Sequence, residues 1–250
     1  MSKKRLRIFA GPNGSGKSTI FEAVNSRFKC PHFVNADLIE RQLSGNGRFS
    51  FDDFNVFVRE GVFREAFRES GLYEKNQQEY GTSEDIYNSI KVTKQNNLTL
   101  DKHLVNSYFA AFVADFLRFN MLNIVENFSV ETVMSDPSKL DYMRTAAKMG
   151  YRIYLYFVST KDVSINLDRI SQRKEEGGHG VPEDKTRSRY ERSLSLLYEA
   201  MTLSDRTYFF DNSGEQWELL AEWDGGLGDL TLKVDSVPSW FNNYLLIKLA

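Results

Sequence analysis

The sequence is poor in the residues that would indicate a secreted, metal-bound or membrane protein. Cys30 is its only cysteine, so no disulfide can form within the chain and nothing indicates an oxidising compartment. His32 and His103 have no partner pattern, which argues against a metal site built from them. No apolar run approaches membrane-spanning length, and no hydrophobic signal core follows the basic first residues. We expect a soluble, cytoplasmic protein.

Neither sign of charge dominates the sequence. It has 34 acidic and 32 basic residues, a formal net charge of −2. Because binding to a nucleic-acid backbone or an anionic membrane requires clustered cations, this balance argues against both partners. Hydrophobic residues make up 41% and charged residues 26% of the 250 positions, which is typical of a globular protein and excludes general disorder.

The strongest motif is Gly-Pro-Asn-Gly-Ser-Gly-Lys-Ser at residues 11–18, which fits the phosphate-loop pattern G-x-x-x-x-G-K-S/T. An apolar run at 6–10 precedes it and suits a buried strand, and a helix is expected to follow. Its glycines let backbone N–H groups turn towards a phosphate, at a helix amino terminus that favours anions. A glycine-rich turn without a ligand is the alternative.

Within this motif, Lys17 would reach the β- and γ-phosphates of ATP, and the Ser18 hydroxyl would bind Mg²⁺. The residues expected to bind the nucleotide are Gly11, Asn13, Gly14, Ser15, Gly16, Lys17, Ser18 and Thr19.

Strand and helix patterns alternate along the rest of the chain. Strands are expected at 6–10, 32–36, 128–133, 151–158, 207–210, 217–223 and 230–234. Helices are expected at 19–28, 38–43, 52–69, 101–125, 137–150, 162–175 and 183–202, and from 238 onwards. Crossover connections of this kind predict an α/β fold: a three-layer P-loop NTPase with a mostly parallel sheet and helices on both faces. We expect one domain over 1–250, with a helical insertion at about 71–125.

The remaining motifs narrow the class of phosphate-loop protein. No predicted strand ends in the Asp-Glu pair of motor or transporter ATPases, and no Asn-Lys-x-Asp guanine-binding motif is present. Residues 169–192 instead place arginines beside a glycine-rich hinge, which is typical of a kinase lid. Such arginines neutralise charge on the transferred phosphoryl group, and closure excludes water as a competing acceptor.

Five motifs together resemble the zeta-toxin-like kinases, in particular their compact bacterial branch. In chain order they are residues 11–18, Asn35-Ala36-Asp37, Val130-Glu131-Thr132, the lid Gly177-Gly178-His179-Gly180-Val181-Pro182 with Arg187-Ser188-Arg189-Tyr190, and Asp211-Asn212-Ser213. The resemblance covers 5–70 and 126–223 and leaves 71–125 without a counterpart. It implies transfer of phosphate from ATP, with Mg²⁺, to a hydroxyl of UDP-N-acetylglucosamine, and control by an antitoxin.

The resemblance assigns three residues to the acceptor. Asp37 would be the general base, acting mainly by orienting the acceptor hydroxyl, and Glu131 and Thr132 would help to hold the acceptor. Two alternatives stay open: Asp37 as the N-cap of the following helix, and Glu131 as an ion-pair partner of a lid arginine. Val133 stands where many relatives have a second threonine, which weakens the inference about the acceptor.

The resemblance also assigns residues to the nucleotide. Arg173 and either Arg187 or Arg189 would contact the ATP phosphates, and Asn212 would lie beside the adenine. The alternative for the arginines is a solvated helix face, and His179 is interpreted as shaping the turn rather than taking part in catalysis.

Two further hypotheses compete with a sugar-nucleotide kinase. The chain could bind ATP to change a surface for a protein partner, in which case Asp37 would be dispensable and Lys17 would not. It could also phosphorylate an RNA or a protein hydroxyl, although the near-neutral charge argues against RNA.

Overall fold

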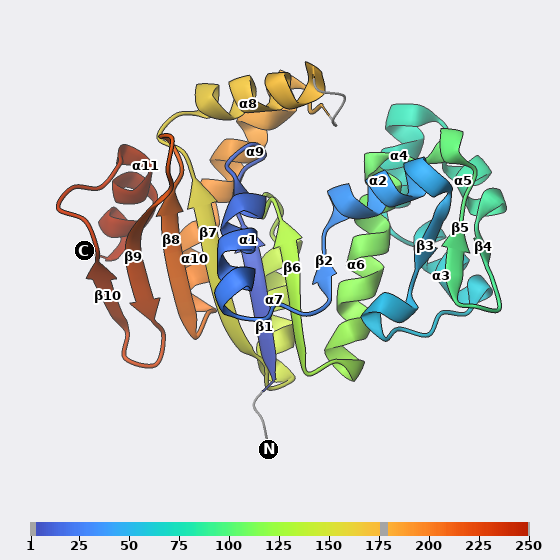
Figure 1. Cartoon of the computed structure of the whole chain (residues 1–250), viewed down its shortest axis with the longest axis horizontal. Coiled ribbons are helices and arrows are strands. Elements are labelled where there is room, and N and C mark those ends of the chain that lie inside the picture. Colours follow the sequence, from blue (N-terminus) through green and yellow to red (C-terminus); the bar gives the residue numbers. More distant parts are fainter. Residues whose placement is uncertain (1–3, 176–179, 250) are drawn as a thin grey trace. The chain divides into compact units, whose positions relative to one another are not determined.

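The computed structural model describes residues 4–175 and 180–249. Its contacts divide the chain into two compact units: the sheet unit, which joins Met1–Pro31 to Glu126–Ala250, and the inserted unit, His32–Val125. The inserted unit contains the whole of the predicted insertion 71–125 together with residues 32–70. Figure 1 labels the elements of both units.

The sheet unit is built on a mostly parallel sheet, in which its strands follow the order β10-β9-β8-β7-β1-β6. The strands are β1 (Arg5–Ala10), β6 (Asn127–Thr132), β7 (Arg152–Ser159), β8 (Arg206–Asp211), β9 (Glu218–Asp224) and β10 (Asp229–Leu232). β1 pairs in parallel with β6 and β7, and β7 with β8, whereas β9 and β10 run antiparallel at the edge. The carboxyl ends of the parallel strands therefore meet at one edge, where open α/β sheets bind ligands.

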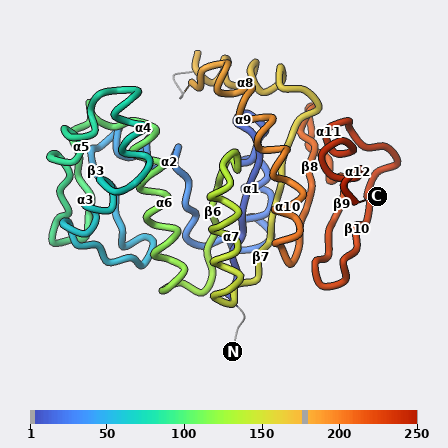
Figure 2. The backbone as a smooth tube through the Cα atoms, turned by 180° about the vertical axis from the view of Figure 1, so that it is seen from behind, coloured from blue at the N-terminus to red at the C-terminus, as the bar shows by residue number. Residues whose placement is uncertain are grey.

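Helices cover both faces of this sheet. They are α1 (Lys17–Arg27), α7 (Ser138–Lys148), α8 (Val163–Glu175), α9 (Glu183–Ser195), α10 (Leu197–Thr202), α11 (Ser239–Phe241), the π-helical turn η3 (Asn242–Leu246) and α12 (Ile247–Leu249). The two opposite views show α1 on one face and α7 and α10 on the other (Figures 1 and 2). The predicted α/β class, with a mostly parallel sheet between helical layers, is confirmed.

Aromatic rings fill the centre of the sheet unit. Phe9 of β1 stacks on Tyr156 of β7, with ring centroids 4.8 Å apart, and Tyr156 stacks on Tyr208 of β8 at 5.1 Å. Phe157 and Phe209, whose side chains leave the opposite face of the same strands, are completely buried. Strands that are apolar on both faces need helices on both sides, which is the arrangement observed.

The inserted unit contains helices and a small antiparallel sheet of order β3-β5-β4. Its elements are β2 (Phe33–Val34), α2 (Ala36–Asn46), β3 (Arg48–Ser50), η1 (Asp52–Phe54), α3 (Glu60–Arg68), α4 (Gly71–Tyr80), α5 (Ser83–Ser89), β4 (Lys91–Val92), β5 (Asn97–Thr99), η2 (Lys102–Leu104) and α6 (Ser107–Ile124). Its core is aromatic: Phe63 of α3 packs 5.1 Å from Phe112 and 4.9 Å from Phe116 of α6, measured between ring centroids.

The predicted helix over 52–69 is wrong in its first half. A 3₁₀ turn ends at Asn55, which has a left-handed backbone with φ 57°, and the α-helix begins only at Glu60. The Asn96 side chain holds the extended segment between them, because it donates to the Val56 carbonyl at 2.8 Å and accepts from the Val58 N–H at 3.0 Å.

Two apolar side chains within 52–69 are exposed, Phe57 at 77% and Val62 at 59%. The strand expected over 32–36 is shorter than predicted, at Phe33–Val34, and the helix expected over 183–202 is interrupted at Leu196.

Among the described helices, none has the length and hydropathy needed to cross a bilayer.

Candidate nucleotide-binding site

The loop between β1 and α1 has, at three positions, a positive φ that favours glycine. Gly11, Gly14 and Gly16 have φ angles of 141°, 76° and 91°. An added Cβ would lie 2.0 Å from the Val158 carbonyl oxygen at Gly11 and 2.0 Å from Asn212 Nδ2 at Gly16. These glycines therefore allow the rest of the protein to pack closely around the loop.

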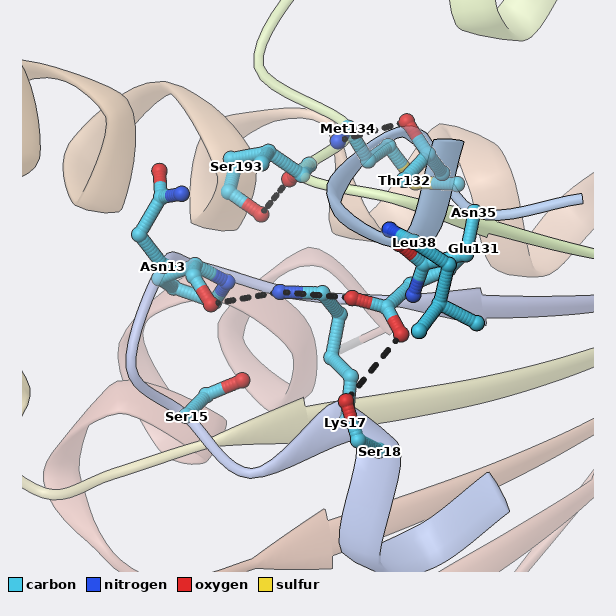
Figure 3. Close-up of polar contacts among 12 residues, drawn as sticks. Asn13, Ser15, Lys17, Ser18, Asn35, Leu38, Glu131, Thr132, Met134 and Ser193 are labelled. Atoms are coloured by element: carbon cyan, nitrogen blue, oxygen red, sulfur yellow. Dashed lines mark hydrogen bonds and ion pairs between the residues drawn. The ribbon is translucent and has the colours of Figure 1, made fainter. Parts of the chain in front are cut away.

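The Glu131 carboxylate lies close to Lys17, which is expected to bind phosphate, and to Ser18, which is expected to bind the metal. The buried Lys17 ammonium donates to the Pro12 carbonyl at 2.9 Å and lies 3.8 Å from Glu131 Oε1. Ser18 Oγ donates to Glu131 Oε2 at 3.4 Å (Figure 3). The parallel register, with Phe9 opposite Glu131, places this side chain at the carboxyl edge next to the loop.

These residues fit a nucleotide-bound magnesium ion. A serine hydroxyl beside a carboxylate offers the oxygen ligands that a hard cation prefers, directly or through water. Across 4–175 and 180–249 no cluster of three or more His, Cys, Asp or Glu side chains could hold a metal alone. The ion would therefore depend on phosphate oxygens and water for its remaining ligands, as Mg²⁺ in phosphoryl-transfer sites commonly does.

Two asparagine side chains from the C-terminal half of the chain hold the phosphate loop. Asn212 Nδ2 donates to the Ser15 carbonyl at 2.9 Å, which places this amide against the loop. Asn166 Nδ2, on α8, donates to the Asn13 carbonyl at 2.6 Å. Asn166 is not among the site residues predicted from the sequence. A usable signal was present, because this polar residue lies one turn before the buried Ile170 on the same helix face.

The inserted unit carries Asp37 in the first turn of α2. The N-cap of this helix is Asn35, whose side chain accepts from the Leu38 N–H at 3.1 Å, so the alternative of Asp37 as the N-cap is wrong. Asp37 itself is exposed, and its carboxylate complements the positive end of the helix dipole. Its role as a general base stays a prediction.

The predicted lid arginines lie on two helices. Arg173 is in the last turn of α8, and Arg187 and Arg189 are on α9. Arg187 forms an ion pair with Glu183 one turn earlier, at 2.8 Å from Nη2 to Oε1. The predicted hinge, with Gly177, Gly178 and His179, lies outside the described residues.

Helix α9 is also bonded to the segment that follows β6. Ser193 Oγ donates to the Val133 carbonyl at 2.8 Å. The Thr132 hydroxyl accepts from the Met134 N–H at 3.1 Å (Figure 3). Thr132 was predicted to contact the acceptor, and it stands at the carboxyl end of β6, directly after Glu131.

Comparison with known proteins gives one partial sequence match and a set of structural matches. No protein-family model matches the chain. An uncharacterized protein of Haemophilus influenzae is 36% identical over 63 residues, which are 25% of this chain and 45% of that protein. The crystal structure of AvrRxo1-ORF1:-ORF2 with ATP matches 92% of this chain and 61% of that chain, with 16% identity and a TM-score of 0.56. The PezAT toxin–antitoxin system of Streptococcus pneumoniae matches 85% of this chain and 69% of that chain, with 14% identity and a TM-score of 0.49.

The fold is that of a P-loop NTPase. At 16% identity, the AvrRxo1 match bears on the fold alone. In this chain β1 pairs in parallel with β6 and β7, and the glycine loop leads from β1 into α1. The chain spans about three fifths of the AvrRxo1 chain and less than half of the Haemophilus protein.

Proposed function

We propose that this protein is an ATP-dependent phosphotransferase of zeta-toxin type, which moves the γ-phosphate of ATP to a hydroxyl of a small molecule. The contact of Glu131 with both Lys17 and Ser18 carries this proposal. It joins a phosphate-binding ammonium, a metal-binding hydroxyl and a carboxylate at the edge of the sheet where P-loop enzymes bind nucleotides. The AvrRxo1 match, a structure determined with ATP, supports the nucleotide.

Each group of residues has a proposed part in the transfer. The loop N–H groups and Lys17 would bind the phosphates, and Ser18 with Glu131 would hold Mg²⁺. When bound, Mg²⁺ neutralises charge on the phosphate oxygens. Arg173 and one of Arg187 or Arg189 would stabilise the charge on the transferred group. In this assignment Glu131 serves the metal, whereas the sequence motif had placed it with the acceptor.

The acceptor side depends on Asp37 and Thr132. Asp37 would orient the acceptor hydroxyl and receive its proton late in a loose transition state, and Thr132 would contact the acceptor. The resemblance of Asn35-Ala36-Asp37 and Val130-Glu131-Thr132 to the zeta-toxin motifs supports UDP-N-acetylglucosamine as the acceptor. A second chain, ORF2, accompanies AvrRxo1-ORF1 in its structure, which supports an antitoxin-like partner here as well.

The test combines ATP binding with detection of a phosphorylated product. Purified protein is incubated with MgATP and a panel of UDP-sugars, and the sugar nucleotides are analysed by mass spectrometry. We expect Lys17→Ala to abolish ATP binding, because the loop loses its only lysine. We expect Asp37→Asn to bind ATP normally and to lower transfer about 10²- to 10⁴-fold. Asp85→Asn is the matched control, because Asp85 is likewise an exposed acid in the first turn of a helix, α5.

Three results separate the competing hypotheses. ATP binding that is unchanged in Lys17→Ala would overturn the nucleotide site. The second result is that no UDP-sugar is phosphorylated and that Asp37→Asn and Asp85→Asn behave alike. It would overturn the sugar-nucleotide kinase and favour an ATP-dependent regulatory protein. Phosphate transferred instead to added RNA or protein would keep the phosphotransferase and replace its acceptor.

A further inference from the structure

A buried series of hydrogen bonds connects the phosphate loop to both helices that carry the predicted lid arginines. The Asn166 amide, on α8, donates to the Asn13 carbonyl of the loop at 2.6 Å. Thr160, in the connection from β7 to α8, donates from Oγ1 to Asn166 Oδ1, and this hydroxyl also lies 3.1 Å from the Asp162 carbonyl. The Thr160 carbonyl accepts from the Tyr190 hydroxyl, on α9, at 2.6 Å.

The residues that form these hydrogen bonds are buried, so water cannot replace a partner that is lost. Thr160 and Asn166 have no exposed surface, and Tyr190 is 6% exposed. Because the Asn166 amide donates from Nδ2 and accepts at Oδ1, rotating it by half a turn would break both bonds and leave buried polar groups without partners. Burial also raises the pKa of Tyr190 to about 12, so its hydroxyl keeps its proton at neutral pH.

The same helix contacts the loop through its backbone. A Cβ on Gly14 would lie 2.6 Å from the Asn166 carbonyl oxygen, so the first turn of α8 packs directly on the loop. Arg173 follows Asn166 by two turns on α8, and Arg187 precedes Tyr190 by one turn on α9. A shift of the loop would therefore be transmitted to both helices that carry these arginines.

We propose that Thr160, Asn166 and Tyr190 are positioning residues that hold the phosphate loop, α8 and α9 in one geometry for binding ATP. The inference rests on the proposed nucleotide site and adds residues that do not contact the nucleotide themselves. Each hydrogen bond acts through the loop or through a helix, so its loss is expected to weaken ATP binding without removing any phosphate ligand.

The sharpest test uses a pair of variants at one position. Thr160→Val keeps the shape of the side chain and removes the hydroxyl, whereas Thr160→Ser keeps the hydroxyl. We expect Thr160→Val to raise the Kd for MgATP about 5- to 10-fold, the cost of one hydrogen bond, and Thr160→Ser to stay within about 2-fold of the parent protein. Calorimetric titration measures the Kd, and urea unfolding of the same samples measures stability.

Tyr190→Phe tests the α9 end of the series, with a similar rise in Kd expected. Tyr151→Phe and Ser204→Ala are matched controls. Tyr151 is a buried tyrosine just before β7, at the amino edge of the sheet, and Ser204 is a buried serine that donates to the Ala200 carbonyl at 2.8 Å. These controls are expected to alter stability and leave the Kd for MgATP unchanged.

The double variant Thr160→Val, Tyr190→Phe distinguishes a connected series from two separate packing defects. If the bonds act in series, the double variant binds MgATP about as well as the weaker single variant. Additive losses, or single variants that bind like Tyr151→Phe, would overturn the inference. Lys17→Ala is titrated in the same experiment to distinguish failure of this inference from failure of the proposed nucleotide site. If the nucleotide site is wrong, Lys17→Ala binds ATP normally; if only this inference is wrong, Lys17→Ala still loses ATP binding.

Discussion

Gly16 must be glycine for two separate physical reasons. Its φ of 91° lies in the left-handed region, and a Cβ there would lie 2.0 Å from Asn212 Nδ2. Asn212 cannot move away without losing its 2.9 Å bond to the Ser15 carbonyl of the same loop. Side-chain packing and backbone conformation thus impose the same residue.

We therefore expect Gly16→Ala to weaken ATP binding by more than about 10-fold, because a strain of roughly 1–3 kcal/mol distorts the loop. Gly45→Ala is the control, since Gly45 lies within α2 and a Cβ there meets nothing within 4 Å. Alanine at this helical position should leave ATP binding unchanged and stabilise the protein by up to about 1 kcal/mol. Titration with MgATP decides the matter, and a Gly16→Ala variant with parental affinity would contradict the packing argument.

At the scale of elements, the start of α2 depends on Asn35. This buried side chain accepts from the Leu38 N–H at 3.1 Å and satisfies one of the free donors in the first turn, where Asp37 lies. A cap two residues before a proposed catalytic carboxylate would hold that carboxylate in a fixed first turn.

We expect Asn35→Ala to lower the free energy of unfolding by about 1 kcal/mol, whereas Asn35→Asp retains an oxygen acceptor and most of the stability. Urea unfolding followed by circular dichroism measures both variants. An Asn35→Ala protein as stable as Asn35→Asp would be inconsistent with this cap.

At the scale of the whole molecule, the burial of Tyr156 makes the free energy of unfolding depend on pH in the alkaline range. Burial, partly offset by the nearby Arg7, raises the pKa of Tyr156 from its ordinary value of 10.0 to about 12. Because the pKa of Tyr156 is higher in the folded state than in the unfolded state, the protonated side chain contributes to the free energy of unfolding. This contribution is fully present below pH 10 and is lost as the pH rises towards 12.

Tyr156→Phe is expected to match the parent protein near neutral pH and to lose stability less steeply above pH 10. Free energies of unfolding from urea titrations over this pH range provide the measurement. Parallel curves for the parent and the variant throughout that range would rule out a contribution from Tyr156.

Local patterns allowed much of the sheet unit to be predicted. The strands near 6–10, 128–133, 151–158 and 207–210 were identified to within about two residues at each end, because buried parallel strands are continuously apolar between turns. Prediction was poorer over 52–69. There the left-handed Asn55 and the bonds from Asn96, some forty residues away, override a helical pattern.

The phosphate loop and the α/β alternation can be predicted from the sequence alone, since both depend on residues that are neighbours along the chain. Which side chains meet at that loop depends on how the strands are ordered in the sheet. Glu131 reaches Lys17 and Ser18 because β6 pairs with β1, and Asn166 and Asn212 reach the loop because β7 and β8 follow in the same sheet. Contacts between residues more than a hundred positions apart depend on strand order, which no local pattern contains.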